Sequence, residues 1–513
     1  MTIADLGGAV LGPLDRLAAL LVDPRHRERT AAQLLLGYVA VWTLYAVLAK
    51  GGQDLHFDMG EAVAWSREPA FGYSKHPPLS AWVVKAWFTI FPLADWAYYL
   101  LAMVSAGLAL WIAWLLSARW LDAEKRAAGL ALLTLVPFFN FHALKFNANS
   151  VLIPLWAATT LWFLRSFEQR DLLSAALAGV AAAAAMLGKY WSIVLLGGLA
   201  VAALADGRRS SYFRSPAPWI TVTVGLLVLS PHLVWLLAHG SSTFDYALSK
   251  YPASSLLEEI VGSMKFLAGS VAYVAVPVVL TGALTLPNAA MIRDTLWPAD
   301  AHRRLAAVAF WSPFFLALVM GTAAQTRLSS LWMMSAVTLL PVVLLSSPLV
   351  SMRRGALPLL LGLAVATPVL VTLAAPGVAY VVHGKGIPHH AKHYRLIAAA
   401  MDRAWRAATP RPMSLVGSDT NLGNGVAFYL SDRPSTFDVL DPRQTPWADE
   451  ARIAKQGIAL LCAIGEKNCM DAVDALAARF ARSQRMEIEV ARDYLGAAGK
   501  PERYLIITIP PQS

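Results

Sequence analysis

Residues 57–79 read FDMGEAVAWSREPAFGYSKHPPL, and they follow an apolar run, residues 31–49, that is long enough to cross a bilayer. The stretch brings two acids and two bases close together: Asp58, Glu61, Lys75 and His76. Two prolines follow the bases and hold the chain extended, because proline fixes its own φ and restricts the residue before it. Ionisable groups this close to a membrane-spanning segment favour a functional site.

The composition of the chain is typical of a polytopic membrane protein. Of its 513 residues 57% are hydrophobic and only 15% are charged, whereas soluble proteins have about 25% charged residues. The formal net charge of +10 does not indicate nucleic-acid binding, because Lys and Arg collect in the cytoplasmic loops of membrane proteins. We therefore expect membrane lipids, and no nucleic acid, around this chain.

Eleven hydrophobic runs predict membrane-spanning helices. They are residues 31–49, 97–117, 127–144, 150–164, 172–187, 190–205, 218–237, 267–287, 306–321, 331–348 and 356–375. A twelfth run, residues 78–91, is shorter than a span and carries Lys85, which favours a helix at the membrane surface. The basic loops then fall at every second connection, so we expect the N-terminus inside the cell and the C-terminus outside.

Residues 1–30 are predicted to form a cytoplasmic amphipathic segment. Apolar residues recur there at helical spacing: Val10, Leu14, Leu17 and Leu21. No basic region precedes the apolar stretch and no small-residue cleavage site is evident, so we do not expect a cleaved signal peptide.

The composition changes after residue 377. Residues 378–395 are predicted to be a basic linker rich in histidine: His383, His389, His390 and His393. No acid or Cys lies nearby, which favours an anion-attracting strip over a metal site. Residues 396–513 alternate helical and strand patterns and predict a small external α/β domain. Its two cysteines, Cys462 and Cys469, form either a disulfide or two free thiols, since spacing alone does not establish the geometry.

The expected topology places the chemically varied segments on the outer face. In the first external loop, residues 50–96, Asp58 and Glu61 are three apart and would share one face of a short helix. The alternatives are a solvated helix start for Glu61 and contact with lipid headgroups for Lys75. Outer turns supply the other candidates: His142, Lys145, Asn147, Asn149, Lys189, Tyr190 and Arg327. Hydrogen bonding between helices is the alternative role of the two Asn side chains.

The segments FDMGEAVAWSREPAFGYSKHPPLSAW, HALKFNANSVLIPLW and LGKYWS resemble the bacterial GT-C glycosyltransferases related to protein O-mannosyltransferases and lipid A aminoarabinose transferases, glycosyltransferase family 39. The resemblance covers about residues 30–350 and implies a GT-C membrane domain over residues 31–377. It also implies a polyprenyl-phosphate sugar donor and an inverting transfer on the periplasmic face of the bacterial inner membrane. Lipid A, a polysaccharide or a protein would be the acceptor.

Matched to the family pattern, Asp58 is the expected catalytic carboxylate, Glu61 is the nearest second acid, and His76 is the base before the two prolines. Asn149 stands where the family has another acid, which argues against a strongly metal-dependent site. No cofactor is certain, and a divalent metal ion is left open. The alternative function is a transporter or flippase for a lipid-linked sugar. The clustering of ionisable residues at one face and the absence of a sequence repeat disfavour it.

Overall fold

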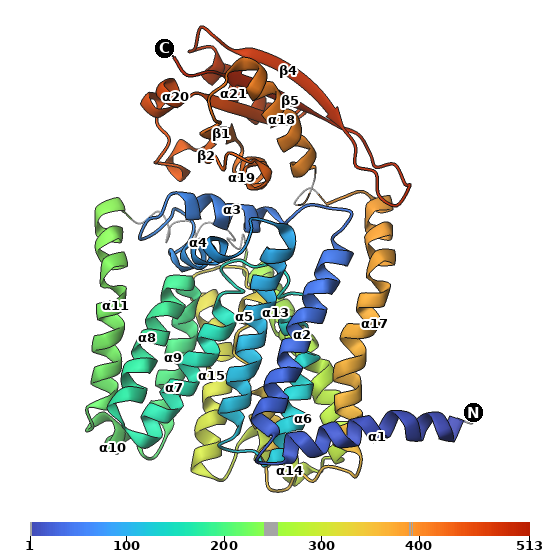
Figure 1. The fold of residues 1–513 in the computed structure, drawn as a ribbon. Coiled ribbons are helices and arrows are strands. Elements are labelled where there is room, and N and C mark those ends of the chain that lie inside the picture. The colour runs from blue at the N-terminus through green and yellow to red at the C-terminus, as the bar shows by residue number, and fades with distance from the viewer. Residues whose placement is uncertain (1–2, 241–254, 389–390, 392, 513) are drawn as a thin grey trace.

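The computed structural model of the chain describes residues 3–240, 255–388, 391 and 393–512. A bundle of helices forms the body, and a β-sheet with its own helices lies over one end of that bundle (Figure 1). The N-terminal helix α1 (Ile3–Val22) lies across the opposite end (Figure 1). This place fits the amphipathic surface segment predicted for residues 1–30.

Eleven α-helices build the described part of the bundle. They are α2 (Arg27–Ala49), α5 (Asp95–Ser117), α6 (Ala123–Thr134), α7 (Leu152–Gln169), α8 (Leu172–Gly188), α9 (Ile193–Ala205), α11 (Ala217–His239), α13 (Leu256–Thr285), α15 (Ala301–Ala323), α16 (Leu340–Leu345) and α17 (Ala356–Lys385). Each predicted span overlaps one of them. Six of the described helices are long and apolar enough to cross a membrane, namely α2, α5, α11, α13, α15 and α17. The total of eleven spans therefore stays a prediction.

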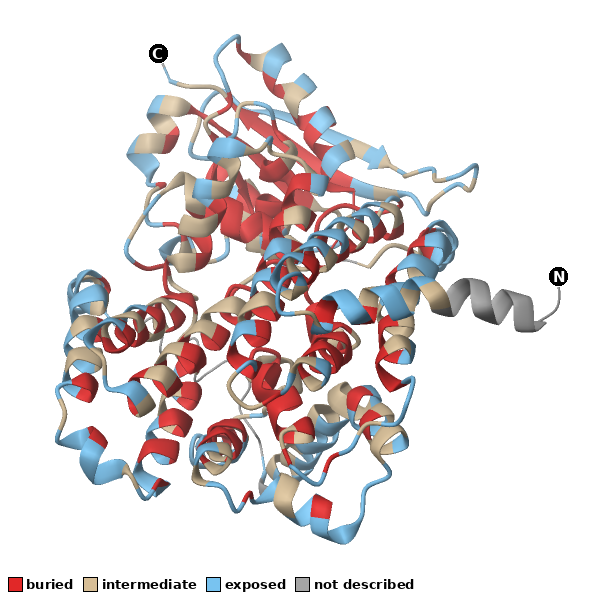
Figure 2. Ribbon diagram, turned by 60° about the horizontal axis from the view of Figure 1, so that its bottom comes forward, coloured by how far each residue is buried: buried red, intermediate tan, exposed pale blue. Residues whose placement is uncertain are grey.

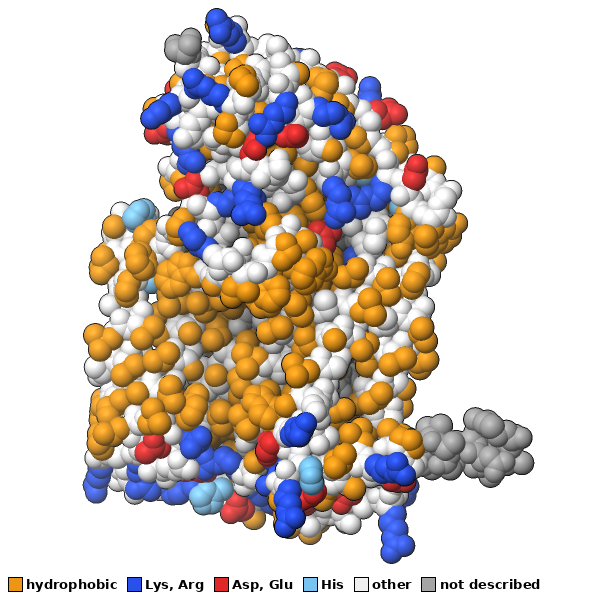
Figure 3. All heavy atoms as spheres, in the orientation of Figure 1, with side chains coloured by type: hydrophobic (Ala, Val, Ile, Leu, Met, Phe, Trp, Pro, Cys, Tyr) orange, Lys and Arg blue, Asp and Glu red, His pale blue; other side chains and the backbone are white. Residues whose placement is uncertain are grey.

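The two ends of the bundle differ in chemistry. Hydrophobic side chains cover its flank, and Lys and Arg gather at the end away from the sheet (Figure 3). Helices α6, α8 and α15 start at that end with Asp122, Asp171 and Asp300, whose carboxylates accept backbone N–H groups of the first turn. The short helices α10 (Arg209–Phe213) and α14 (Ala289–Leu296) lie there as well (Figure 1). These features are those expected of the cytoplasmic side.

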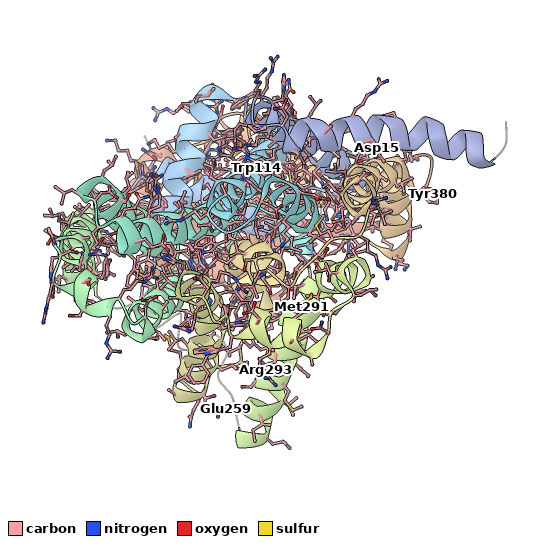
Figure 4. All side chains as sticks on the ribbon, turned by 90° about the horizontal axis from the view of Figure 1, so that it is seen from below. Asp15, Trp114, Glu259, Met291, Arg293 and Tyr380 are labelled. Atoms are coloured by element: carbon pink, nitrogen blue, oxygen red, sulfur yellow. A yellow bond between two sulfur atoms is a disulfide. The ribbon has the colours of Figure 1, made fainter. Side chains whose placement is uncertain are left out.

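One charged cluster at this end contains a buried arginine. Arg126 is 4% exposed, and its guanidinium bonds Glu28 and lies 3.6 Å from the ring centre of Trp114, a residue labelled in the view from below (Figure 4). The indole of Trp114 donates a hydrogen bond of 2.6 Å to the same carboxylate. The cluster ties α2, α5 and α6 together below the bundle.

Two surface helices, α3 (Phe57–Arg67) and α4 (Leu79–Ile90), lie between the bundle and the sheet (Figure 1). Helix α4 matches the predicted surface helix at residues 78–91. Arg67, at the end of α3, donates hydrogen bonds to the carbonyls of Pro434 and Ala427. The next residue, Glu68, forms an ion pair of 2.8 Å with Arg452. Residues 50–96, predicted to be the first external loop, are therefore attached to the C-terminal part of the chain.

The C-terminal part contains five strands in the order β2-β1-β3-β5-β4. Its elements are α18 (Tyr394–Ala408), β1 (Leu415–Ser418), α19 (Thr420–Tyr429), β2 (Ser435–Asp438), α20 (Glu450–Gln456), β3 (Ile458–Ala463), α21 (Lys467–Ala477), β4 (Gln484–Val490) and β5 (Glu502–Ile509). Strand β1 is parallel to β2 and β3, whereas β5 is antiparallel to β3 and β4. The predicted α/β fold is confirmed.

Helices cover both faces of this sheet. Alternate residues of a strand point to opposite faces, and Val416 of β1 packs with α18 and α19 while its neighbour Leu415 packs in the core on the other face, with α21. Buried residues accordingly run through the centre of the sheet (Figure 2). Cys462 and Cys469 lie in the core with α21 and form a disulfide, with 5.9 Å between their Cα atoms.

The predicted linker differs from the structure at its start. Helix α17 continues to Lys385, so residues 378–385 are helical. His383 and His393 are each 3% exposed, and the ring of His383 lies 3.1 Å from the carbonyl of Ala497 in the loop after β4. These two histidines therefore do not form an exposed strip, because the loop after β4 covers His383 and strand β5 contacts His393. His389 and His390 lie outside the described residues.

Candidate active site

The site begins at the N-terminal end of α3. His56 caps this helix through its Nδ1 atom, which accepts the backbone N–H of Asp58 at 3.1 Å. Asp58 lies in the first turn, where a carboxylate is favoured by the helix dipole. Glu68 and Pro69 end the helix, since a proline cannot continue it. The cap therefore fixes the backbone that carries Asp58.

The carboxylate of Asp58 is held by the turn at residues 141–149. Its Oδ2 atom lies 3.0 Å from Nζ of Lys145 and accepts a hydrogen bond of 3.0 Å from Asn147. Its Oδ1 atom lies 3.7 Å from Nδ1 of His56. Burial raises the pKa of Asp58, but the charge of Lys145, the nearby His56 ring and the hydrogen bonds from Asn147 and Lys145 outweigh it and lower the pKa to about 2. Asp58 is therefore ionised at neutral pH.

The same turn connects Asp58 to a second lysine. The side-chain oxygen of Asn147 accepts the backbone N–H groups of Asn149 and Ser150, which fixes the turn. Asn149 accepts a hydrogen bond of 2.7 Å from Nζ of Lys189. That ammonium also lies 5.1 Å from the ring centre of Trp332. Five predicted residues thus form one chain of contacts: Asp58, Lys145, Asn147, Asn149 and Lys189.

Glu61 contacts a different part of the protein. Its carboxylate pairs with Nζ of Lys75 at 2.5 Å, and the two side chains are 12% and 20% exposed. Both line the narrow space between the first external loop and α19 and β2. Ser74, next to Lys75, bonds Gln444 of the C-terminal part. Although Asp58 and Glu61 are three residues apart, Asp58 contacts Lys145 and Asn147 of the 141–149 turn, whereas Glu61 pairs with Lys75.

Three further candidates contact the ring of an aromatic or histidine residue. The ring of His76 packs edge-on against Trp65, with 6.0 Å between the centroids. The hydroxyl of Tyr190 lies 2.7 Å from Nε2 of His232. The ring of His142 packs edge-on against Tyr273 at 5.0 Å.

Arg327 is the candidate that the structure separates from the others. It forms an ion pair of 2.8 Å with Glu258 at the start of α13. Both side chains are about half exposed, at 52% and 43%. Within the described residues Arg327 contacts none of the other candidates. Its position on a predicted outer turn therefore did not indicate whether it lies near the other candidates.

Two histidines that the sequence did not single out take part in the geometry. His56 caps α3 beside Asp58, and His232 connects Tyr190 to the carbonyl of Phe71 in the first external loop. His232 is 2% exposed in the middle of an apolar run. A lone polar residue in such a run was the available signal, because burial there requires a partner.

The part of the chain that the structure describes contains no cluster of side chains suited to bind a metal ion. No group of three or more His, Cys, Asp or Glu side chains is placed to hold one there. The carboxylate of Asp58 already contacts a lysine and an amide. The metal requirement is therefore left open.

Comparison with known proteins connects this geometry to an enzyme class. Residues 75–235 match the family model described as dolichyl-phosphate-mannose-protein mannosyltransferase. The chain is 26% identical over 322 residues to the lipopolysaccharide core galacturonosyltransferase RgtB of Rhizobium johnstonii. That match covers 59% of this chain and 63% of RgtB, less than two thirds of the relative. RgtA of the same organism is 24% identical over 79% of this chain and 81% of RgtA.

A solved structure extends the likeness to nearly the whole chain. ArnT from Cupriavidus metallidurans, bound to undecaprenyl phosphate, aligns with a TM-score of 0.61 over 93% of this chain and 98% of ArnT, at 14% identity. The chain has the GT-C glycosyltransferase fold. Together with the family-model match and the two galacturonosyltransferase relatives, this fold supports the superfamily predicted from the three resembling segments, and the chain is a multi-pass membrane protein. The matches to named glycosyltransferases support the predicted enzyme class.

Proposed function

We propose that this GT-C protein transfers a sugar from a polyprenyl-phosphate donor to an acceptor on the periplasmic face of the bacterial inner membrane. The observation that carries the proposal is the ionised carboxylate of Asp58, held by Lys145 and Asn147 at the sheet-covered end of the bundle. The relatives RgtA and RgtB are named for galacturonosyl transfer to lipopolysaccharide core. The acceptor of this chain would be lipid A, a polysaccharide or a protein.

In this mechanism Asp58 orients the acceptor hydroxyl and takes its proton. The hydroxyl oxygen forms a bond to the anomeric carbon, while the bond from that carbon to the phosphate oxygen breaks and its electron pair leaves with the polyprenyl phosphate. The configuration of the sugar inverts and no covalent enzyme intermediate forms. A carboxylate with a pKa of about 2 is a weak base. Proton transfer therefore follows bond formation, when the hydroxyl has become acidic.

Cations near Asp58 are assigned to the departing phosphate. Lys189 contacts a neutral amide and an aromatic face, whereas the charge of Lys75 is balanced by Glu61. Lys189, Lys145, Lys75 and His76 are the candidates for this role, and Lys189 belongs to the chain of contacts that starts at Asp58. Fixed positive charge at this place stabilises the negative charge that develops on the phosphate.

The contact geometry disfavours the transporter alternative. Transporters place their ionisable residues near the membrane midplane, at broken helices of repeated halves. Here Asp58 belongs to α3, which lies at one end of the bundle, between the bundle and the C-terminal part (Figure 1).

A paired experiment tests the function. Mass analysis of the cell envelope, comparing wild type with a deletion strain, is expected to show the loss of one sugar mass from one acceptor class. The purified protein is then assayed with that acceptor and a synthetic polyprenyl-phosphate sugar. Asp58→Asn should lose about 10²–10⁴-fold in kcat, the usual contribution of general-base catalysis, and Glu61→Gln should lose less.

The matched control is Asp474→Asn, which removes an exposed carboxylate that pairs with Arg485 in the C-terminal part. It should turn over like wild type. An unchanged envelope, or an Asp58→Asn variant with wild-type turnover, would contradict the proposal.

A further inference from the structure

A cavity of about 730 Å³ lies where the bundle meets the C-terminal part, outside the contacts of Asp58 described above. Its walls come from the end of α2, the start of α5, the start of α18, the end of α19 and the segment after β4. Four basic residues line it: Lys50, Arg395, Arg433 and Arg492. Basic side chains are visible at this level (Figure 3). We call this space the junction cavity.

Only part of this positive charge is balanced. Arg395 pairs with Asp95 at 2.7 Å, and Arg492 pairs at 2.5 Å with Asp54, which is 1% exposed. Among the described residues, the side chains of Lys50 and Arg433 have no acidic partner. The junction cavity therefore keeps two positive charges that an anionic ligand would balance.

The partial burial of Lys50 also favours an anionic ligand beside it. It caps the C-terminal end of α2 and is half-buried. Burial lowers the pKa of Lys50 below its ordinary value, because desolvation disfavours the ammonium form. A negative charge beside Nζ would stabilise that form again.

The junction cavity borders a second, smaller one that lies beside Asp58. This second cavity holds about 290 Å³ and shares Lys50, Gln53 and Tyr99 with the first. Its lining also includes His56 and Lys145, which both contact Asp58. The two spaces thus adjoin one another between the C-terminal part and the proposed catalytic carboxylate.

The membrane side of the junction cavity is apolar. Val47 and Trp96 line it and are 37% and 44% exposed. Both belong to helices, α2 and α5, that are long and apolar enough to span a bilayer. Tryptophan at the end of a span is typical of the level of lipid headgroups. A ligand in this cavity would therefore have its polar part between the basic residues and its apolar part toward the bilayer.

We infer that the junction cavity binds the anionic headgroup of the acceptor lipid, through phosphate or carboxylate groups held by Lys50 and Arg433. This inference rests on the proposed function. It deepens that function by naming the acceptor as a negatively charged lipid whose hydroxyl reaches Asp58 through the second cavity. The Asn149–Lys189 contact is left for the donor phosphate.

The test measures binding without turnover. The full chain in phosphatidylcholine nanodiscs is titrated with fluorescent bisphosphoryl lipid A and with the same lipid after removal of its phosphates. Wild type should bind the phosphorylated form more tightly. Lys50→Met and Arg433→Gln should each weaken that binding about 10- to 100-fold, the usual effect of losing one charge-assisted contact. Arg482→Gln is the matched control, because Arg482 is exposed after α21 and lines neither cavity.

Three outcomes would overturn the inference. The first is equal affinity for the two lipid forms, and the second is wild-type affinity in both cavity variants. The third is displacement of the lipid by inorganic phosphate at concentrations near the dissociation constant of phosphate itself, which would indicate a site for the free ion. Because the binding measurement needs no donor, its failure is distinguishable from failure of the proposed function. Active Asp58→Asn protein would contradict the proposed function, whereas wild-type lipid binding by the cavity variants would contradict only the inference.

Discussion

Asp58 and Lys145 form the pair of charges on which the proposed chemistry depends, and their contact predicts a pH dependence. The pKa of Asp58 is about 2, below the ordinary 3.8, so the ionised form stabilises the fold above about pH 4, and this stabilisation is lost as the pH falls toward 2. Protonation of Asp58 should therefore not reduce wild-type activity above about pH 4. Lys145→Met removes the charge that lowers this pKa most, so the acid-side loss of kcat/KM should move to higher pH.

The measurement is the pH–rate profile between pH 4 and 8. The control is Lys85→Met, since Lys85 is an exposed lysine of α4 in the same loop. It should leave the profile unchanged. A Lys145→Met profile that keeps its activity down to pH 4, as wild type should, would show that Asp58 does not depend on this lysine.

The Glu61–Lys75 pair predicts an effect on stability. Both side chains are mostly buried, so Glu61→Gln or Lys75→Met alone removes one half of this ion pair and should destabilise the protein by about 1–3 kcal/mol. The double variant should recover part of this loss. Thermal unfolding of the four proteins in one detergent gives the comparison. Strictly additive losses would mean that the two charges do not interact.

The sequence predicted Asp58 and some of the residues around it, but it did not predict others. Asp58, Lys145 and Asn147 were predicted because polar groups at the ends of apolar runs are expensive unless they function. His56 was missed because its role as helix cap depends on where α3 starts. Asp54 was missed because its partners, Arg395 and Arg492, come from a distant part of the chain.

At the scale of elements, the close contact between α3 and α19 predicts the effect of one methyl group. A Cβ on Gly60 would lie 2.7 Å from the backbone oxygen of Asn424, so one helix must move. Gly60→Ala should cost about 1–3 kcal/mol, the usual cost of overpacking, and should lower the unfolding temperature and the activity together. Gly37→Ala is the control, because a Cβ there meets nothing within 4 Å. Equal unfolding temperatures for the two variants would contradict the contact.

The element boundaries show which sequence signals were strong. Each long apolar run overlaps a helix of the bundle, and the alternating patterns of residues 396–513 predicted the α/β fold that contains hydrophobic strands such as β3 and β5. Strand β2 was missed because its four residues, Ser435–Asp438, are short and polar, and only pairing with β1 makes them a strand. Helix α17 extends past the predicted end because the loop after β4 covers its last turns.

At the scale of the whole molecule, the basic loops predict the orientation in the membrane. A reporter that works only outside the cytoplasm should be active when fused after residue 395 and inactive when fused at residue 210 or 300. The reason is that Lys and Arg in short loops are retained in the cytoplasm. Expression of each fusion, checked by immunoblot, is the control. Activity at residue 210 would reverse the topology and move Asp58 to the cytoplasmic side.

The attachment of α3 to the C-terminal part has a consequence for how this protein can change over evolutionary time. Arg67 binds the carbonyls of Ala427 and Pro434, and Glu68 pairs with Arg452, so the helix that carries Asp58 is anchored by residues encoded more than 350 positions later. A C-terminal part inherited from another lineage would bring different anchors and displace that helix. The two segments must therefore be inherited together, and a substitution in one is expected to be matched by a compensating substitution in the other.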